Sequence, residues 1–363
     1  MSQVWNAIAP LSSGGTIKVQ PANFQAGYNM ALTHTNKKLP NMNLDLLIDN
    51  LKNPALLFFI LGIIAVRLKS DLAIPENSSK FISLYLLFAI GFKGGQELAH
   101  SEFSMEIIYC IIFGLSTAVL IPIITFFILK KKLSVSNAGA IAAAYGSVSA
   151  VTFVTAISFL ELQGITFNGH MVAVMALMEA PAIIVGVVLI RMFSSKKETD
   201  ASQSLGSIIK HSFTNGSVLL ILGSLVIGFL ASDEQALGIK PFTNDLFKGF
   251  LAIFLLDMGI VCGKKLKDFL KNGAFTTVFG IVVPLINGII FACLSGFFTQ
   301  NIGDRFMLAV LAASASYIAV PAAMKIAVPK ANPGIFIPMA LAITFPVNIT
   351  IGMPIYMFVI MSC

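Results

Sequence analysis

The chain has 363 residues, of which 56% are hydrophobic and 11% are charged, and its mean hydropathy is +0.87. Soluble domains carry roughly 25% charged residues, so this composition excludes an ordinary soluble protein and predicts an all-helical integral membrane protein. The formal net charge of +7 has a topological explanation in such a protein, and no nucleic-acid partner is expected.

Residues 1–53 precede the first apolar run. They lack a basic stretch followed by an apolar stretch, so they are not a signal peptide. Residues 1–53 are either an ordered cap or an unstructured arm, and the arm is favoured. Met42 is an alternative start of the native chain. We therefore treat 1–53 as an N-terminal arm that precedes the membrane spans.

Ten apolar runs bounded by polar or turn residues follow, and each is interpreted as a membrane span. Several are shorter than the roughly 20 residues of an ideal crossing, which is typical of tilted or broken helices. The first five form one unit (54–193), a cytoplasmic linker follows (194–214), and the last five form a second unit (215–363). The predicted spans cover 54–70, 79–96, 104–129, 137–160, 168–192, 215–231, 244–263, 270–298, 304–327 and 334–361.

Two motifs occur in both units and in the same order. IGFKGGQEL at Ile90–Leu98 recurs as MGIVCGKKL at Met258–Leu266, and AAAYGSVSAVT at Ala142–Thr152 recurs more loosely as LAASASYIAVP at Leu311–Pro321. Because each unit has an odd number of spans, the two copies must enter the membrane in opposite orientations. The sequence therefore predicts a 5+5 inverted repeat, an arrangement typical of secondary transporters.

Lysine and arginine are distributed unevenly between the short loops. The loops on one side contain most of them, including Lys130–Lys132, Lys196–Lys197 and Lys264–Lys271. Basic loops face the cytoplasm, so we predict a multi-pass protein of the inner (plasma) membrane with both termini outside. Apart from the N-terminal arm, the outer side has only Lys93, Lys240, Lys248 and Arg305.

The fourth and ninth spans contain runs of small and hydroxyl residues, Tyr145–Thr152 and Ser314–Pro321. These residues weaken the helical hydrogen-bond ladder, so both helices are predicted to be broken. Half-helix N-termini would present N–H groups to an anion, with hydroxyls and carbonyls left for a cation. Close helix packing is the alternative for each run alone, but their matching positions favour a binding site. The predicted substrate contacts are Gly146, Ser147, Ser149, Ala150, Ser314, Ser316, Tyr317 and Ala319.

Glu179 follows an uncharged apolar stretch and precedes Ala180-Pro181, which is expected to open the fifth helix. A charge at the bilayer centre costs roughly 2.5–3.5 kcal/mol, and a bound cation would offset that cost. Pairing with a lysine near an interface is the alternative. We predict sodium as the coupling ion and as the metal bound by Glu179. The predicted cation ligands are Ser149, Thr152, Glu179, Ser314 and Asn348.

Other polar residues of the spans have structural explanations as well as functional ones. Asp257 is either a second acid of the site or a partner of Lys264 or Lys265. Asn348 either lines the same cavity as Glu179 or bridges helices. The glycines of the repeated motif are interpreted as close helix contacts. The four cysteines show no CxxC or metal-ligand spacing, and no nucleophile–base pair or phosphate loop occurs, so neither an enzyme nor an organic cofactor is expected.

Several short motifs, in this order, resemble the sodium-dependent bicarbonate transporter family known from cyanobacteria. The resemblance extends from Asn53 to Met361 and implies a fold related to bile-acid-symporter-like transporters. It also implies a core domain (spans 3–5 and 8–10) that moves against a gate domain, and a homotrimer. The motifs are NPAL at Asn53–Leu56, IGFKGG at Ile90–Gly95, AYGSVSAVT at Ala144–Thr152, MEAPA at Met178–Ala182 and ANP at Ala331–Pro333.

The resemblance places Ser149 and Thr152 at small polar positions of the first break. It places Ser314 and Ser316 in a serine run of the second break. Glu179 stands at a position where the family has an aspartate. The chain departs from the family where Tyr317 replaces an aspartate. Further departures to apolar residues are Ala150, Val151, Ala319 and Val320. The binding site is therefore expected to be less polar, which leaves the identity of the anion open.

The sequence as a whole predicts a secondary active transporter for the sodium-coupled uptake of bicarbonate or another small anion. Two alternatives stay open. One is a proton-coupled or efflux carrier of a small carboxylate. The other is a membrane scaffold or sensor that does not transport, in which the altered breaks no longer bind a solute.

Overall fold

The computed structural model describes residues 52–363, except for 102, 195–205, 207–209, 211–213 and 271–272. These residues belong to one unit of the chain, Met42–Cys363. The predicted N-terminal arm (1–53) and most of the predicted linker (194–214) lie outside the described residues. Every regular element among the described residues is a helix, as the composition predicted.

Six helices precede the linker in the described part of the chain. Asn53 caps the first of them by accepting a hydrogen bond from the Ala55 N–H, with Pro54 at its first position, a favourable way to begin a helix. Gly164 ends another in the left-handed conformation (φ 64°). The helices are α3 (Pro54–Arg67), α4 (Glu76–His100), α5 (Met105–Leu129), α6 (Val135–Gly146), α7 (Ala150–Gln163) and α8 (His170–Phe193).

The second part of the chain begins with α10 (Gly216–Leu230) and α11 (Asp233–Lys240). No helix was predicted at α11, where Ser232 and Gln235 form a capping box. The remaining elements are η1 (Pro241–Asp245), α12 (Phe247–Leu270), α13 (Ala274–Ser295), α14 (Ile302–Ala313), α15 (Ala319–Ala327), α16 (Pro333–Pro338), η2 (Met339–Thr344), α17 (Phe345–Val347), η3 (Asn348–Gly352) and α18 (Met353–Ser362), where η marks a π-helical stretch.

Helices occupy each range in which the sequence predicted a span. Six helical segments among the described residues are long and apolar enough to cross a membrane, and α3 and α10 are shorter apolar helices. Many of their large apolar side chains are exposed, for example Ile124 on α5 and Val278 on α13. Side chains of this kind find a favourable environment in lipid. The protein is a multi-pass helical membrane protein.

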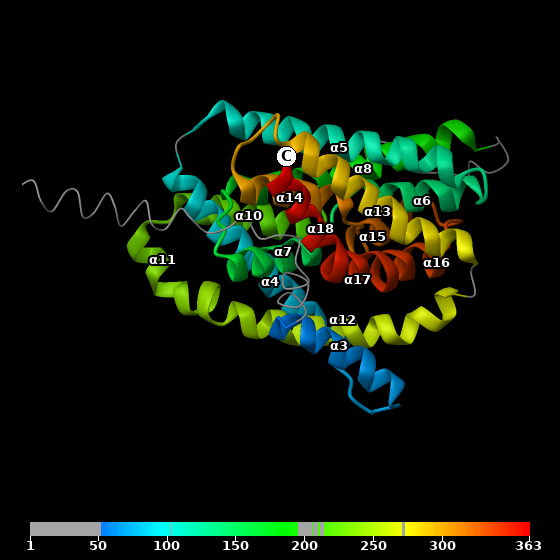
Figure 1. Cartoon of the computed structure of the whole chain (residues 1–363), viewed down its shortest axis with the longest axis horizontal. Coiled ribbons are helices and arrows are strands. Elements are labelled where there is room, and N and C mark those ends of the chain that lie inside the picture. Colours follow the sequence, from blue (N-terminus) through cyan, green and yellow to red (C-terminus); the bar gives the residue numbers. More distant parts are fainter. Residues whose placement is uncertain (1–51, 102, 195–205, 207–209, 211–213, 271–272) are drawn as a thin grey trace, which may run out of the picture. The chain divides into compact units, whose positions relative to one another are not determined.

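Four helices form a paired-helix group in which α3 packs along α12 and α4 packs along α10 (Figure 1). Glycines allow the backbones of each pair to touch. A Cβ atom on Gly95 would lie 2.1 Å from the Leu225 carbonyl oxygen, and one on Gly259 would lie 2.1 Å from the Phe59 carbonyl oxygen. Small residues commonly allow such close contacts between membrane helices, and the interpretation of these glycines as structural is confirmed.

The remaining helices form a break-containing group. In it, α5 packs against α6 and α8, and α13 packs against α14 and α18. Figure 1 shows α5 and α8 at the upper edge, α3 and α12 at the lower edge, and α14, α15 and α7 between them. This arrangement encloses the interrupted helices between the long ones.

The prolines of the two parts act differently. The expectation that Ala180-Pro181 opens its helix is wrong, because α8 continues through Pro181 from His170 to Phe193. A proline removes only one helical donor, and neighbouring helices can support the remaining backbone. Near the end of the chain, by contrast, π-helical turns follow Pro338 and Pro346 and interrupt the helix twice.

Candidate functional site

The first break separates α6 from α7. Ser147 and Ser149 have extended backbones, and Ser149 caps α7 by accepting a hydrogen bond from the Thr152 N–H at 3.2 Å. Gly146, the last residue of α6, lies so close to α5 that a Cβ atom would come within 2.0 Å of Pro122 Cγ. The break therefore depends on a residue without a side chain followed by a serine that begins a new helix.

The second break separates α14 from α15. The helix ends at Ser314, whose hydroxyl donates to the Leu311 carbonyl at 2.9 Å. The chain then bends at residues 317–318 before α15 begins at Ala319, and the Ser316 hydroxyl accepts the Val320 N–H at 3.4 Å. A serine hydroxyl thus bonds to the first turn of the new helix at both breaks, although only Ser149 is the residue that caps its helix.

The two breaks contact each other directly. The Ser149 N–H donates to the Ser314 hydroxyl at 3.0 Å, and the Ser316 N–H donates to the Ala144 carbonyl at 2.8 Å. These bonds satisfy backbone groups that the interruptions release, as buried backbone requires. The sequence predicted the two breaks and their proximity, and the structure confirms both.

A small cavity lies beside the paired breaks. It has a volume of about 30 Å³, which accommodates about two waters at the roughly 10–15 Å³ that each requires. Residues of α4 and α10 form its opposite wall, so it lies between the paired-helix group and the break-containing group. The polar residues that line it are Ser83, Ser149, Glu179, Ser217, Ser316 and Tyr317.

Five of the predicted site residues line this cavity. They are Ser149, Ala150, Glu179, Ser316 and Tyr317. Ser314 lies behind it and bonds to the Ser149 backbone. The remaining predicted residues are buried nearby but are not part of its wall: Gly146, Ser147, Thr152, Ala319 and Asn348. The cavity thus unites the two breaks with the intramembrane acid.

Two of the residues outside the wall have informative surroundings. The Ser147 hydroxyl is fully buried and has no hydrogen-bond partner among the described residues. Asn348, in contrast, donates to the Ala313 carbonyl at 2.7 Å and accepts from the Tyr356 hydroxyl at 2.7 Å. Asn348 therefore supports the carbonyl end of α14, and its predicted role as a cation ligand stays a prediction.

Glu179 lines the cavity together with Met175 and Ala176 of its own helix, α8, and with residues of both breaks. It is half-buried and forms no ion pair with another described residue. A carboxylate in such apolar surroundings is costly unless a cation or a proton accompanies it. The oxygen atoms around the cavity, which are one carboxylate and several hydroxyls, are the kind of donors that hard cations prefer.

Tyr317 occupies the position at which the family pattern has an aspartate. Its hydroxyl contacts Met258 Sδ of α12 at 3.7 Å, and its ring packs edge-on against Phe345. The side chain thus connects the second break to the paired-helix group. At this position the wall of the cavity is formed by a neutral aromatic side chain.

Asp257 has a different environment from Glu179. It is buried on α12 and accepts a hydrogen bond from the Ser79 hydroxyl of α4. It forms no ion pair with another described residue, and it does not line the cavity. Asp257 therefore connects two helices of the paired-helix group.

Two further serines, Ser83 and Ser217, complete the polar wall of the cavity and were not predicted. Ser83 lies on α4 and Ser217 begins α10. Neither lies in a repeated motif or a helix break. An isolated serine in a span is common, so these two hydroxyls become recognisable only when the helix packing is known.

Comparison with protein families connects this site to a known class of protein. No curated protein matched the chain. A family model described as the Na⁺-dependent bicarbonate transporter superfamily matches residues 54–361, from the first residue of α3 to the last residue but one of α18. The match confirms the resemblance found in the short motifs and shows a transporter, not an enzyme. The chain belongs to the Na⁺-dependent bicarbonate transporter superfamily.

Proposed function

We propose that the protein is a secondary active transporter that couples the uptake of bicarbonate or another small anion to the entry of sodium. The observation that carries the proposal is the contact between the two helix breaks beside Glu179. Two distant segments meet through the Ser149–Ser314 and Ala144–Ser316 hydrogen bonds, and the resulting cavity contains a carboxylate without an ion-pair partner among the described residues.

The cavity offers distinct groups to a cation and to an anion. Sodium is proposed to bind the Glu179 carboxylate with oxygen atoms of Ser149 and Ser316, because it is a hard cation that prefers oxygen ligands. The anion is proposed to bind near the N-termini of α7 and α15, where the helix dipoles favour negative charge. The anion and the cation would then reduce each other's desolvation cost.

The size of the cavity supports a small solute. At about 30 Å³ it leaves room for an ion and little more in this conformation. Glu179 and Tyr317 both contribute to its wall. A large organic anion would need these side chains and α4 to move apart. A small inorganic anion or a short carboxylate is therefore the favoured substrate class.

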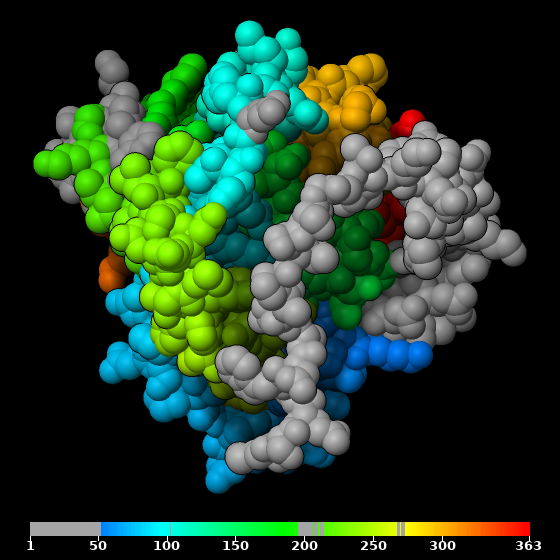
Figure 2. All heavy atoms as spheres, turned by 90° about the vertical axis from the view of Figure 1, so that its left-hand side faces the viewer, coloured from blue at the N-terminus to red at the C-terminus, as the bar shows by residue number. Residues whose placement is uncertain are grey.

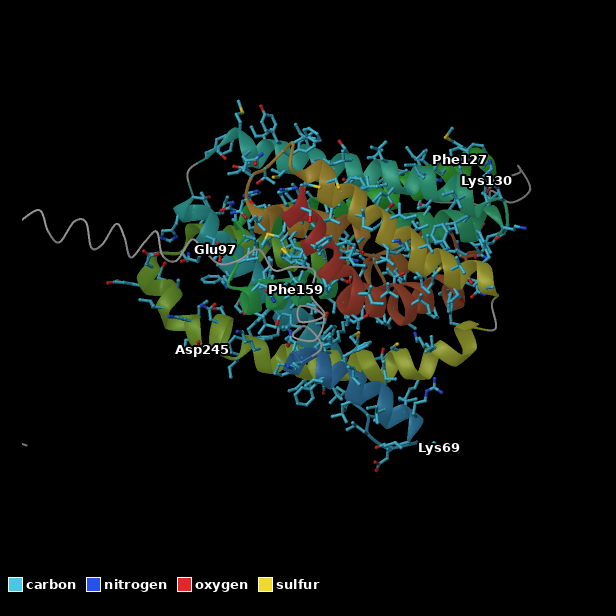
Figure 3. All side chains as sticks on the ribbon, in the orientation of Figure 1. Lys69, Glu97, Phe127, Lys130, Phe159 and Asp245 are labelled. Carbon is cyan, nitrogen blue, oxygen red and sulfur yellow. The ribbon has the colours of Figure 1, made fainter. Side chains whose placement is uncertain are left out.

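The architecture that we propose has ten spans in a 5+5 inverted repeat, with both termini outside. Figure 3 shows Lys130, from a predicted cytoplasmic loop, at the opposite end of the helices from Glu97, which is near the predicted outer lysines. Lys130 lies over the ring of Phe193, 3.7 Å from its centroid, as expected of a lysine at a membrane interface. In the proposed mechanism the break-containing group moves against the paired-helix group, and the protein is a homotrimer of the inner membrane.

The orientation has a direct test. Cysteine introduced at Lys131 should be protected from a membrane-impermeant maleimide in intact cells, whereas cysteine at Lys240 should be labelled. Both variants carry serine at the exposed positions Cys293 and Cys363 to remove background labelling. Labelling of the Lys131 position alone would reverse the proposed orientation.

Transport is tested in proteoliposomes that contain the full-length protein. Uptake of labelled bicarbonate should require an inward sodium gradient and should not respond to a potassium gradient. Glu179→Gln should abolish the sodium-dependent part, because the neutral amide cannot balance the charge of the cation. Asp257→Asn is the matched control, since Asp257 is a buried acid outside the cavity, and it should retain sodium dependence. Equal uptake by wild type and Glu179→Gln would contradict the proposal.

A second candidate function rests on Tyr317. Because this side chain occupies the place of a family aspartate and narrows the cavity, a scaffold or sensor that binds sodium without transporting an anion has structural support. Tyr317→Asp separates the two functions. A transporter with an altered anion preference should accept different anions when this carboxylate is restored. A scaffold should show no uptake of any small anion before the substitution.

A further inference from the structure

A second, larger cavity lies away from the helix breaks. It has a volume of about 220 Å³ and is enclosed by residues of α4, α7, η1 and α12. An adjoining cavity of about 300 Å³ shares Lys93, Thr243 and Asn244 with it and extends to α11. We call the two together the vestibule. Figure 2 shows this end of the described structure, where α11 and η1 lie beside the end of α4.

Charged side chains of both signs line the vestibule. Three of the four basic residues that the sequence assigned to the outer side line it: Lys93, Lys240 and Lys248. The acidic residues that line it are Glu97, Glu161 and Asp233. Because these carboxylates balance the charge of the lysines, an anion can bind here only where a carboxylate moves away from its lysine partner.

The Glu161 carboxylate lies between two of these lysines. Its Oε2 atom is 2.9 Å from Lys248 Nζ, and its Oε1 atom is 4.0 Å from Lys93 Nζ. The lysines belong to α12 and α4 of the paired-helix group, whereas Glu161 belongs to α7 of the break-containing group. The side chains of Lys93, Lys248 and Glu161 are 44%, 70% and 35% exposed, so water and small ions can reach all three.

We infer that Lys93 and Lys248 form a capture site for a small oxyanion, and that the Glu161 carboxylate occupies this site in the conformation described here. A carboxylate and a bicarbonate ion have the same planar O–C–O group and the same single negative charge. Two ammonium groups that hold one oxygen each therefore suit either of them. The identification of the captured anion with the transported one rests on the proposed function.

The helix α7 connects the capture site to the helix breaks. Ser149 caps the first turn of α7, and Glu161 lies in its last turn. The two residues are separated by roughly 18 Å along the helix at 1.5 Å per residue. A displacement of α7 relative to α4 and α12 would withdraw Glu161 from the lysines and alter the break at the same time. The lysines would then be free to bind an anion from solution when the site at the breaks rearranges.

An ordinary surface ion pair is the competing explanation, and it makes a different prediction. Exposed pairs contribute little to stability, and removing one of their charges has little effect elsewhere. In that case, substitution of Glu161 would alter the local charge but would not create an affinity for bicarbonate. A capture site requires the affinity for bicarbonate to increase.

Asn244 provides a reporter position, because it is exposed and lines both cavities. Asn244→Cys is prepared in a Cys293→Ser, Cys363→Ser background. The purified full-length protein is labelled with a negatively charged and with a positively charged methanethiosulfonate, and the ratio of the two rates is measured. One unit charge about 4 Å away in water changes the rate of each reagent about fivefold, in opposite directions for the two reagents. Lys93→Gln and Lys248→Gln should therefore each lower this ratio about 25-fold. Glu161→Gln should raise it by a similar factor.

Protection by sodium bicarbonate, compared with sodium chloride at equal ionic strength, tests binding. Bicarbonate should slow labelling by the anionic reagent in the Glu161→Gln variant more strongly than in wild type, and not at all once Lys248→Gln is added. Lys240→Gln is the matched control. It removes the same charge from the vestibule but is not part of the Glu161 pair, so bicarbonate protection should persist.

An unchanged ratio in Glu161→Gln, or equal protection by bicarbonate and chloride, would overturn the capture site. These measurements need neither a sodium gradient nor transport. Sodium-dependent uptake without bicarbonate protection would therefore refute the capture site alone. Protection without uptake would refute the proposed transport while leaving the capture site intact.

Discussion

The hydrogen bond between Ser149 and Ser314 allows the contact between the two breaks to be measured. In Ser314→Ala the Ser149 N–H loses its acceptor at 3.0 Å, and no other partner of this group occurs among the described residues. The Leu311 carbonyl keeps its bond from the Ser314 N–H. One buried donor is thus left unpaired, which costs about 1–3 kcal/mol in soluble proteins. Side-chain bonds in membranes have measured values of about 0.6 kcal/mol on average and 1.7 at most.

We therefore expect Ser314→Ala to lower the free energy of unfolding by about 1–2 kcal/mol, or about a tenfold change in the unfolding equilibrium constant at 1.4 kcal/mol. The assay is reversible unfolding in mixed micelles of increasing denaturing detergent. Ser362→Ala is the control, because its exposed hydroxyl donates only to the Phe358 carbonyl of its own helix. A loss no larger than that of the control would show that this bond does not hold the breaks together.

Three further predictions concern other parts of the molecule. Sodium should raise the melting temperature of wild type but not of Glu179→Gln, and potassium should stabilise neither protein. The reason is that a ligand that binds only the folded state stabilises it by mass action. Equal stabilisation of both proteins by sodium would show that Glu179 is not part of the site. The Sγ atoms of Cys293 and Cys363 lie 3.5 Å apart, so a mild thiol oxidant should join them in a disulfide. Intact mass spectrometry should then show the loss of two hydrogens, and an unchanged mass would contradict the packing of α13 against α18. The Gln96 carbonyl and Asp233 raise the pKa of His100 above its ordinary value. The His100–Asp233 pair should therefore contribute fully to the stability of the folded protein below about pH 6.5, and this contribution should disappear as the pH rises through the raised pKa. A difference in melting temperature between wild type and His100→Gln that does not change with pH would contradict this.

The positions of the helices follow from local sequence signals. Asn53-Pro54 is a helix-starting signal and Gly164 a helix-ending one, and the structure begins α3 and ends α7 at these residues. The breaks were predictable because runs of small and hydroxyl residues occur at matching places in the two repeated motifs. The capping box of α11 was also visible in the sequence, but it lies between two predicted spans, where a loop was assumed.

The parts that could not be predicted depend on how helices face one another. Pro181 and Pro346 have similar sequence surroundings, yet only the second is followed by π-helical turns. Whether a proline opens a helix depends on the neighbours that support its backbone. The same is true of Asn348, whose amide group bonds to Ala313 and Tyr356. Sequence spacing indicates that such a residue is inside the bundle, but not which partner it faces.

The bonds between the breaks have a consequence for biosynthesis. The acceptor of the Ser149 N–H lies 165 residues further along the chain, and the donor to the Ala144 carbonyl, Ser316, is equally late. While the ribosome is still producing α8 to α13, the first break must therefore remain in the membrane with these backbone groups unpaired or hydrated. Because unpaired backbone groups are costly in hydrocarbon, the early helices should associate only loosely until α14 and α15 have been inserted. Truncation before Ser314 should therefore yield an inserted but degradation-sensitive intermediate, and the ion site should be among the last parts of the protein to form.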